Sequence, residues 1–213
     1  MTRSSWWIAL CCSLFTLVGC QSAYYSAMEQ VGYHKREILA DRVEDARESQ
    51  EEAQAQFSSA LEQMKTLVAF DGGDLEAVYD KVRGEYEDAK DAAEAVSDQI
   101  DGVNDVAEAM FDEWERELTQ YQSANLRRTS ETKLRETRQR YDSMLTAMRQ
   151  AEAKMEPVLR RLKDNELYLK HNLNAAAVGA IGQEFDTLER DIERVIAEMN
   201  RAIAESDRFI ASL

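Results

Sequence analysis

Apolar residues recur along the chain in four long segments, at spacings that alternate between three and four positions. The first segment contains Leu39, Val43, Ala46, Gln50, Ala53, Phe57, Ala60, Met64 and Leu67. This spacing places the side chains on one face of an α-helix and averages 3.5 residues, as in coiled coils and helical bundles. We therefore expect a long amphipathic helix over about 23–70.

The second segment follows the sequence "DGGD" at 71–74, which combines two glycines with an aspartate suited to begin a helix. Its apolar positions are Leu75, Val78, Val82, Tyr86, Ala89, Ala93, Val96, Ile100, Val103, Ala107, Met110, Trp114, Leu118 and Tyr121. Gly84 and Gly102 do not change the phase of this pattern. One uninterrupted helix is expected over about 74–122.

The pattern lapses in "QSANLRRTS" at 122–130 and resumes in a third segment, for which we expect a helix over about 128–172. The apolar positions of this segment are Leu134, Tyr141, Leu145, Met148, Met155, Leu159, Leu162, Leu169 and Leu173. Pro157 lies inside it, and a proline there removes a backbone hydrogen bond, so a kink is expected. A new helix beginning at Pro157 is the alternative. After a short connection capped by Asn174, the fourth helix is expected over 175–212.

Four long helices with short connections predict an all-α, elongated antiparallel four-helix bundle, about 60–70 Å long at 1.5 Å per residue. Residues 74–121 carry 16 acidic and 4 basic side chains, whereas 127–170 carry 7 acidic and 12 basic ones. Adjacent antiparallel helices of opposite charge attract each other, so we expect these two to pair. The other reading is that a charged face is left open for a partner.

The first nineteen residues have the features of a bacterial lipoprotein signal peptide. Arg3 supplies a positive charge, and the apolar run 6–18 is shorter than the roughly 20 residues that cross a bilayer core. The run ends in Leu-Val-Gly-Cys at 17–20, which resembles a lipobox. We expect cleavage between Gly19 and Cys20, leaving 20–213 as a single mature domain. An uncleaved membrane anchor and an ordinary signal peptide are the alternatives.

Cys20 would then carry the acyl chains, palmitate among them, and three such chains anchor a protein firmly in a membrane. The next residue is Gln21 rather than aspartate, and in enterobacterial lipoproteins this favours transfer to the outer membrane. The expected location is therefore the cell envelope, at the outer membrane and facing the periplasm.

Composition excludes several functions for this mature domain. Removing Arg3 from 26 basic residues leaves 25 against 41 acidic ones, a net charge of −16, which disfavours nucleic-acid binding. Cys20 is the one cysteine left after cleavage, so neither an internal disulfide nor a cysteine-based metal site is expected. The two histidines, His34 and His171, match neither a di-iron nor a zinc-hydrolase helix motif. We expect no catalytic residues, metal or cofactor, and no enzyme activity.

Two stretches carry more aromatic and polar side chains than a plain helical bundle requires. "MFDEWERELTQY" at 110–121 contains Trp114 and Tyr121, and a tryptophan in such a seam is either core or a hot spot for a protein partner. "RRLKDNELYLKHNLNA" at 160–175 contains His171 and Asn172, which serve either as helix-capping groups or as part of a recognition patch. These four residues are the candidate partner-binding positions.

The lipobox, "FDEWERELTQY", "SETKLRETRQRYDSMLTAMRQAEAKMEPVL" and "LYLKHNLNA" together resemble an uncharacterised, all-helical family of Gram-negative lipoproteins, classed as a domain of unknown function. The resemblance covers nearly the whole chain and implies a lipid-anchored location, without adding catalytic residues. We expect a non-enzymatic envelope lipoprotein that acts as a scaffold or protein-interaction module. A periplasmic module that binds a small molecule or cation is the alternative, and homo-oligomerisation is left open.

Overall fold

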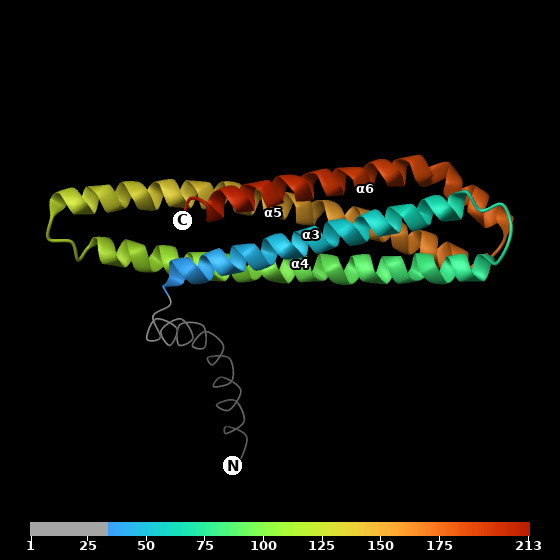
Figure 1. Cartoon of the computed structure of the whole chain (residues 1–213), viewed down its shortest axis with the longest axis horizontal. Helices are drawn as coiled ribbons and strands as arrows, with labels where there is room; N and C mark the ends of the chain where they lie inside the picture. The colour runs from blue at the N-terminus through green and yellow to red at the C-terminus, as the bar shows by residue number, and fades with distance from the viewer. Residues whose placement is uncertain (1–33) are drawn as a thin grey trace, which may run out of the picture.

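The computed structural model describes residues 34–213, which form four long helices (Figure 1). Their bounds are Lys35–Val68 for α3, Leu75–Leu118 for α4, Ala124–His171 for α5 and Ala175–Ile210 for α6. The signal peptide, the cleavage site at Gly19, the lipidation site at Cys20 and the expected start of the first helix at residue 23 lie outside the described residues.

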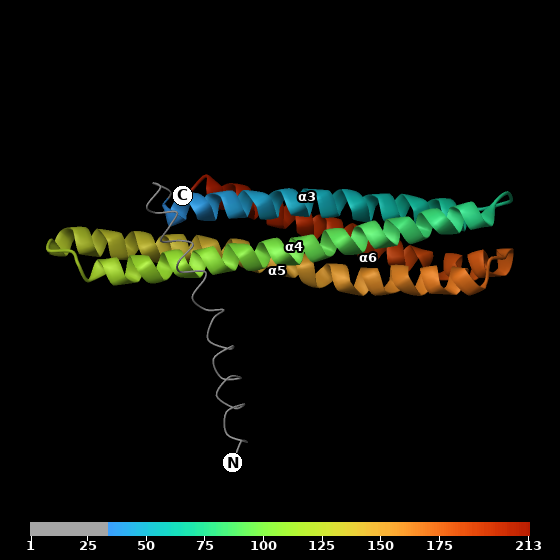
Figure 2. The ribbon, with the colours of Figure 1, turned by 90° about the horizontal axis from the view of Figure 1, so that it is seen from below.

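The helices form a closed antiparallel bundle. Packing contacts join α3 to α4, α4 to α5, α5 to α6 and α6 back to α3, so each helix has two neighbours (Figures 1 and 2). The predicted all-α, antiparallel four-helix bundle is therefore confirmed. Every position predicted to line the apolar face of the first helix is buried in α3, and this includes the polar residue Gln50.

The connections follow from local chemistry. Gly72 and Gly73 have φ values of +151° and +117°, which side-chain-bearing residues rarely adopt, and together they turn the chain between α3 and α4. Asp74 then caps α4, because its Oδ1 accepts a hydrogen bond from the backbone N–H of Ala77 at 3.1 Å.

Pro157 lies inside the continuous helix α5, so the alternative of a new helix beginning there is wrong.

The turn between α4 and α5 is shorter than the polar stretch 122–130 suggested. Helix α4 ends at Leu118, and α5 begins at Ala124 after the cap residue Ser123, whose Oγ accepts from the N–H of Leu126 at 3.4 Å. The start expected at 128 was wrong because apolar periodicity reports burial. The first turns of α5 are helical but exposed, so nothing imposes an apolar stripe on them.

This exposure arises because the four helices differ in length. Helices α4 and α5 contain 44 and 48 residues, against 34 in α3 and 36 in α6. The turn joining α4 to α5 therefore projects beyond the start of α3 and the end of α6 (Figure 1). We call residues 118–130 at this projecting end the tip.

Helices α4 and α5, the acidic and the basic one, do pack side by side. Arg138 of α5 binds Glu115 of α4 with an Nη1–Oε1 distance of 2.6 Å, and Arg149 pairs with Asp101 further along. These ion pairs are exposed, and such pairs contribute about 0–1 kcal/mol each. Charge therefore favours this neighbour arrangement, while the buried apolar seams supply most of the stability.

Candidate functional site

Trp114 and Tyr121, two of the candidate partner-binding residues, converge on one serine near the tip. The indole Nε1–H of Trp114 donates to Ser130 Oγ at 2.8 Å, and the Tyr121 hydroxyl donates to the same oxygen at 3.5 Å. The Trp114 side chain is half-buried and packs against the core, whereas Tyr121 lies in the turn after α4 and is exposed. Trp114 therefore ties α4 to α5, and Tyr121 is the more accessible residue.

His171 and Asn172, the other two candidates, lie at the opposite end of the bundle. His171 is the last residue of α5, and Asn172 caps it by donating its Nδ2–H to the carbonyl oxygen of Tyr168 at 3.0 Å. Trp114 and Tyr121 meet α5 at Ser130, which precedes His171 by 41 residues, so about 62 Å of helix at 1.5 Å per residue separates the two pairs. The four candidates therefore form two distant groups and not one site.

The end that carries His171 also exposes a group of apolar side chains. Of the five large hydrophobic residues that are exposed among residues 34–213, three lie within 167–173, with 41–45% of their surface accessible: Leu167, Tyr168 and Leu173. We call these three residues the far patch. Leu173 was expected to continue the apolar seam of α5, but the helix ends at His171 and Leu173 lies in the turn to α6. Apolar surface gathered in this way marks contact sites more often than scattered exposed residues do.

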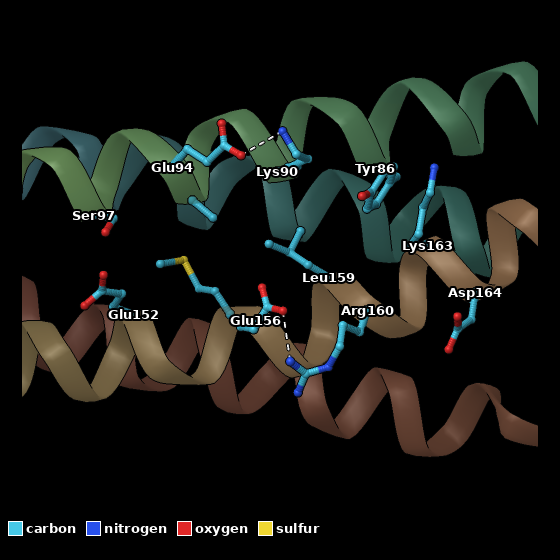
Figure 3. Close-up of a pocket in the computed structure, with 12 residues that line it drawn as sticks. Tyr86, Lys90, Glu94, Ser97, Glu152, Glu156, Leu159, Arg160, Lys163 and Asp164 are labelled. Atoms are coloured by element: carbon cyan, nitrogen blue, oxygen red, sulfur yellow. Dashed lines mark hydrogen bonds and ion pairs between the residues drawn. The ribbon is translucent and has the colours of Figure 1, made fainter. Parts of the chain in front are cut away.

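A groove of about 460 Å³ runs between α4 and α5 in the middle of the bundle (Figure 3). Figure 3 shows Ser97 of α4 and Glu152 of α5 pointing toward one another across it. Its basic residues already have acidic partners: Lys90 binds Glu94 at 2.7 Å, and Arg160 binds Glu156 at 2.9 Å. The groove therefore offers a mixed, internally compensated set of charges.

One buried carboxylate lies near an end of this groove. Glu166 is 3% exposed and accepts hydrogen bonds from the Tyr79 hydroxyl at 3.0 Å and from Lys163 Nζ at 2.9 Å. Burial acts to raise the pKa of Glu166, but the hydrogen bonds from Lys163 and Tyr79 together outweigh it, so that this pKa is lowered. Glu166 is thus a stable anion that joins α5 to α4, and it is unsuited to act as a general acid at neutral pH.

The Tyr79–Glu166 hydrogen bond could not be read from the sequence, because 87 positions separate its partners. Exposed Leu126 at the tip was also missed, since the surrounding polar residues were interpreted as a connection.

No group of three or more His, Cys, Asp or Glu side chains that could hold a metal occurs in residues 34–213. Within the same residues, no helix is long and apolar enough to cross a membrane.

These features define an elongated helical-bundle protein with two chemically different ends and a charged groove between them. Residues 24–213 match a protein family of unknown function, DUF2959, and the chain belongs to this family. No curated protein and no solved structure matches the chain.

Proposed function

We propose that this protein is a non-enzymatic lipoprotein of the Gram-negative cell envelope, anchored by acyl chains on Cys20 and facing the periplasm from the outer membrane. In this proposal the bundle is an interaction module, and the far patch binds a protein partner. The observation that carries the proposal is the grouping of Leu167, Tyr168 and Leu173 at one end of the rod.

The chemistry of the far patch suits a protein partner. Leucine and tyrosine side chains supply apolar area, and the tyrosine hydroxyl and the neighbouring His171 add polar contacts at the rim. Leu167 and Tyr168 lie on the last turn of α5, so the helix fixes their backbone before binding. Such preorganisation lowers the entropy lost on association.

The anchor is tested in cells that express the full chain. Radiolabelled palmitate should be incorporated, and Cys20→Ala should abolish both the label and membrane association. A Cys20→Ala protein that stays in the membrane fraction would overturn the lipid anchor.

The partner surface is tested separately with a photo-crosslinking amino acid at position 168, compared with the same group at position 150 on the exposed middle of α5. The expected result is a discrete crosslinked protein from position 168 only, lost when Leu167→Ser and Leu173→Ser are combined. Unchanged circular dichroism would show that this double variant is folded. Equal crosslinking from both positions, or retention in the double variant, would overturn the assignment of the far patch.

A module that binds a small molecule is the second candidate, and the observation that favours it is the groove between α4 and α5. Because acidic and basic groups alternate there, the ligand would be small and zwitterionic. Substituting Ser97→Trp would fill the groove and abolish ligand-induced thermal stabilisation. A screen in which the folded protein gains no stability from any such compound would leave the interaction module as the function. Homo-oligomerisation stays a prediction, which sedimentation of the mature chain tests.

A further inference from the structure

The tip differs from the rest of this acidic protein in its charge. The chain has 41 acidic residues among 213, yet residues 118–130 contain none and carry two adjacent arginines, Arg127 and Arg128. The tip also has two of the exposed large hydrophobic side chains, Leu126 with 57% of its surface accessible and Tyr121 with 41%. Basic and apolar groups therefore occur together at one exposed end of the bundle.

Both arginines are available to an external anion. Arg127 makes an exposed ion pair with Glu131 one turn along the helix, with an Nε–Oε1 distance of 3.3 Å, and a pair of this kind is weak. Arg128 is exposed and makes no ion pair with any side chain in residues 34–213. Little of the positive charge at the tip is therefore neutralised within the protein.

The tip lies at the end of the bundle where α3 begins (Figures 1 and 2). Lys35 at the start of α3 binds Glu113 of α4 with an Nζ–Oε2 distance of 2.7 Å. From there α4 continues for five residues to Leu118, a rise of about 8 Å. The 13 residues between Cys20 and His34 can span at most about 45 Å, so an anchor at Cys20 leaves the tip within reach of the bilayer.

We propose that the tip docks on an anionic lipid surface, with Leu126 and Tyr121 entering the interface while Arg127 and Arg128 contact lipid phosphates. The inference rests on the proposed lipid anchor, which keeps the tip at a high local concentration near the bilayer. Tyrosine is suited to the boundary between headgroups and acyl chains, and each arginine close to an anionic surface strengthens binding about fivefold.

The remaining surface of the protein sets the orientation. At the opposite end, the turn between α3 and α4 carries Asp71 and Asp74, and the first turn of α4 carries Glu76, all of which an anionic surface repels. Residues 20–213 carry a net charge of −16, from 25 basic and 41 acidic residues, so most of the bundle is also repelled, and the excess of basic residues lies on α5, the helix that begins at the tip. The long axis of the bundle therefore points away from the bilayer, with the tip at the lipid surface and the far patch at the opposite end.

The experiment uses the mature chain coupled through its one thiol, Cys20, to a maleimide lipid in vesicles, which makes the test independent of acylation in cells. A tryptophan replaces Leu126 at the tip or, as a matched control, Gln150 in the middle of α5. Quenching by brominated lipids is compared with that of the unsubstituted chain, in which Trp114 gives the background. Vesicles contain either phosphatidylcholine alone or phosphatidylcholine with phosphatidylglycerol.

The expected result is quenching of the tryptophan at position 126 but not at 150, on the anionic vesicles. Combining Arg127→Glu with Arg128→Glu should abolish it, whereas Arg201→Glu on α6 should leave it unchanged. Raising the salt concentration from 0.1 to 1 M should also release the tip from the vesicle and reduce quenching at position 126, because the Debye length falls from about 10 to about 3 Å.

Three results would overturn the proposal: no quenching at position 126, equal quenching at 126 and 150, or quenching that survives the double charge reversal. Shielding of position 126 that requires added envelope proteins would assign the tip to a protein partner, and would equally overturn it. Failure of palmitate labelling in cells, with quenching at 126 intact in the coupled protein, would reject the anchor alone.

Discussion

The most informative single substitution is at Gln50, a polar residue in the centre of helix α3. Its side chain is completely buried, and neither Oε1 nor Nε2 has a hydrogen-bond partner within residues 34–213. Ala46 and Ala53, one turn before and after it on the same face, are completely buried as well. The long Gln50 side chain therefore fills space that its small neighbours leave, but it does so with an unpaired amide.

Replacing Gln50 by methionine keeps nearly the same length and volume and removes the amide. A buried polar group without a partner destabilises the folded state by about 1–3 kcal/mol, so Gln50→Met should raise the free energy of unfolding by about that amount. For a domain of this size, 1 kcal/mol corresponds to about 2–4 °C in Tm. The expected rise in Tm is therefore about 2–12 °C.

The assay is urea and thermal unfolding followed by circular dichroism, with Gln150→Met on the exposed face of α5 as the control that changes stability by less than about 0.5 kcal/mol. Gln50→Ala removes the amide but leaves a cavity, so it should fall well below Gln50→Met in stability. If Gln50→Met unfolds at the same urea concentration as the wild type or at a lower one, the amide is not an uncompensated group and the reasoning is wrong.

Three further predictions concern a buried carboxylate, the tip and the core. Because the pKa of Glu166 is lowered on folding, its charge stabilises the protein above the unfolded value near 4.5. That advantage over Glu166→Gln should disappear as the pH falls through the folded pKa, as urea unfolding at pH 7, 5, 4 and 3 would show; a pH-independent difference would contradict it. Ser130→Ala should remove the acceptor shared by Trp114 and Tyr121, lowering stability by about 1–2 kcal/mol and shifting Trp114 emission to the red in the mature chain, whereas Thr129→Ala should leave that emission unchanged. Phe57→Ala should destabilise the bundle by about 3–5 kcal/mol in urea unfolding, since this ring is completely buried, and a loss below 1 kcal/mol would refute its place in the core.

The fold could be predicted from the sequence because burial repeats along each helix with one simple period. Every seam position in α3 follows this rule, and Gly84 and Gly102 interrupt α4 no more than the pattern implied. The rule fails where burial ends. The first turns of α5 remain helical with no helix covering them, so their polar sequence was interpreted as a loop.

The candidate residues were only partly predictable for a related reason. Trp114 and Tyr121 stand out by type, yet their common partner Ser130 is a small polar residue with no distinguishing pattern. The hydrogen bond between Tyr79 and Glu166 depends on the register of α4 against α5, which is set by packing along the whole length of both helices. Distances along the chain carry no record of that register.

The unbroken helix α5 has a mechanical consequence. One continuous helix, complete in its backbone hydrogen bonds apart from the one that Pro157 cannot donate, joins Ala124 at the tip to His171 beside the far patch over about 72 Å. The two ends therefore move as the ends of a lever: a tilt of about 10° at the tip displaces the far patch sideways by about 12 Å, given that length. A small tilt at the tip would thus become a large sideways displacement of the far patch, without any rearrangement inside the bundle.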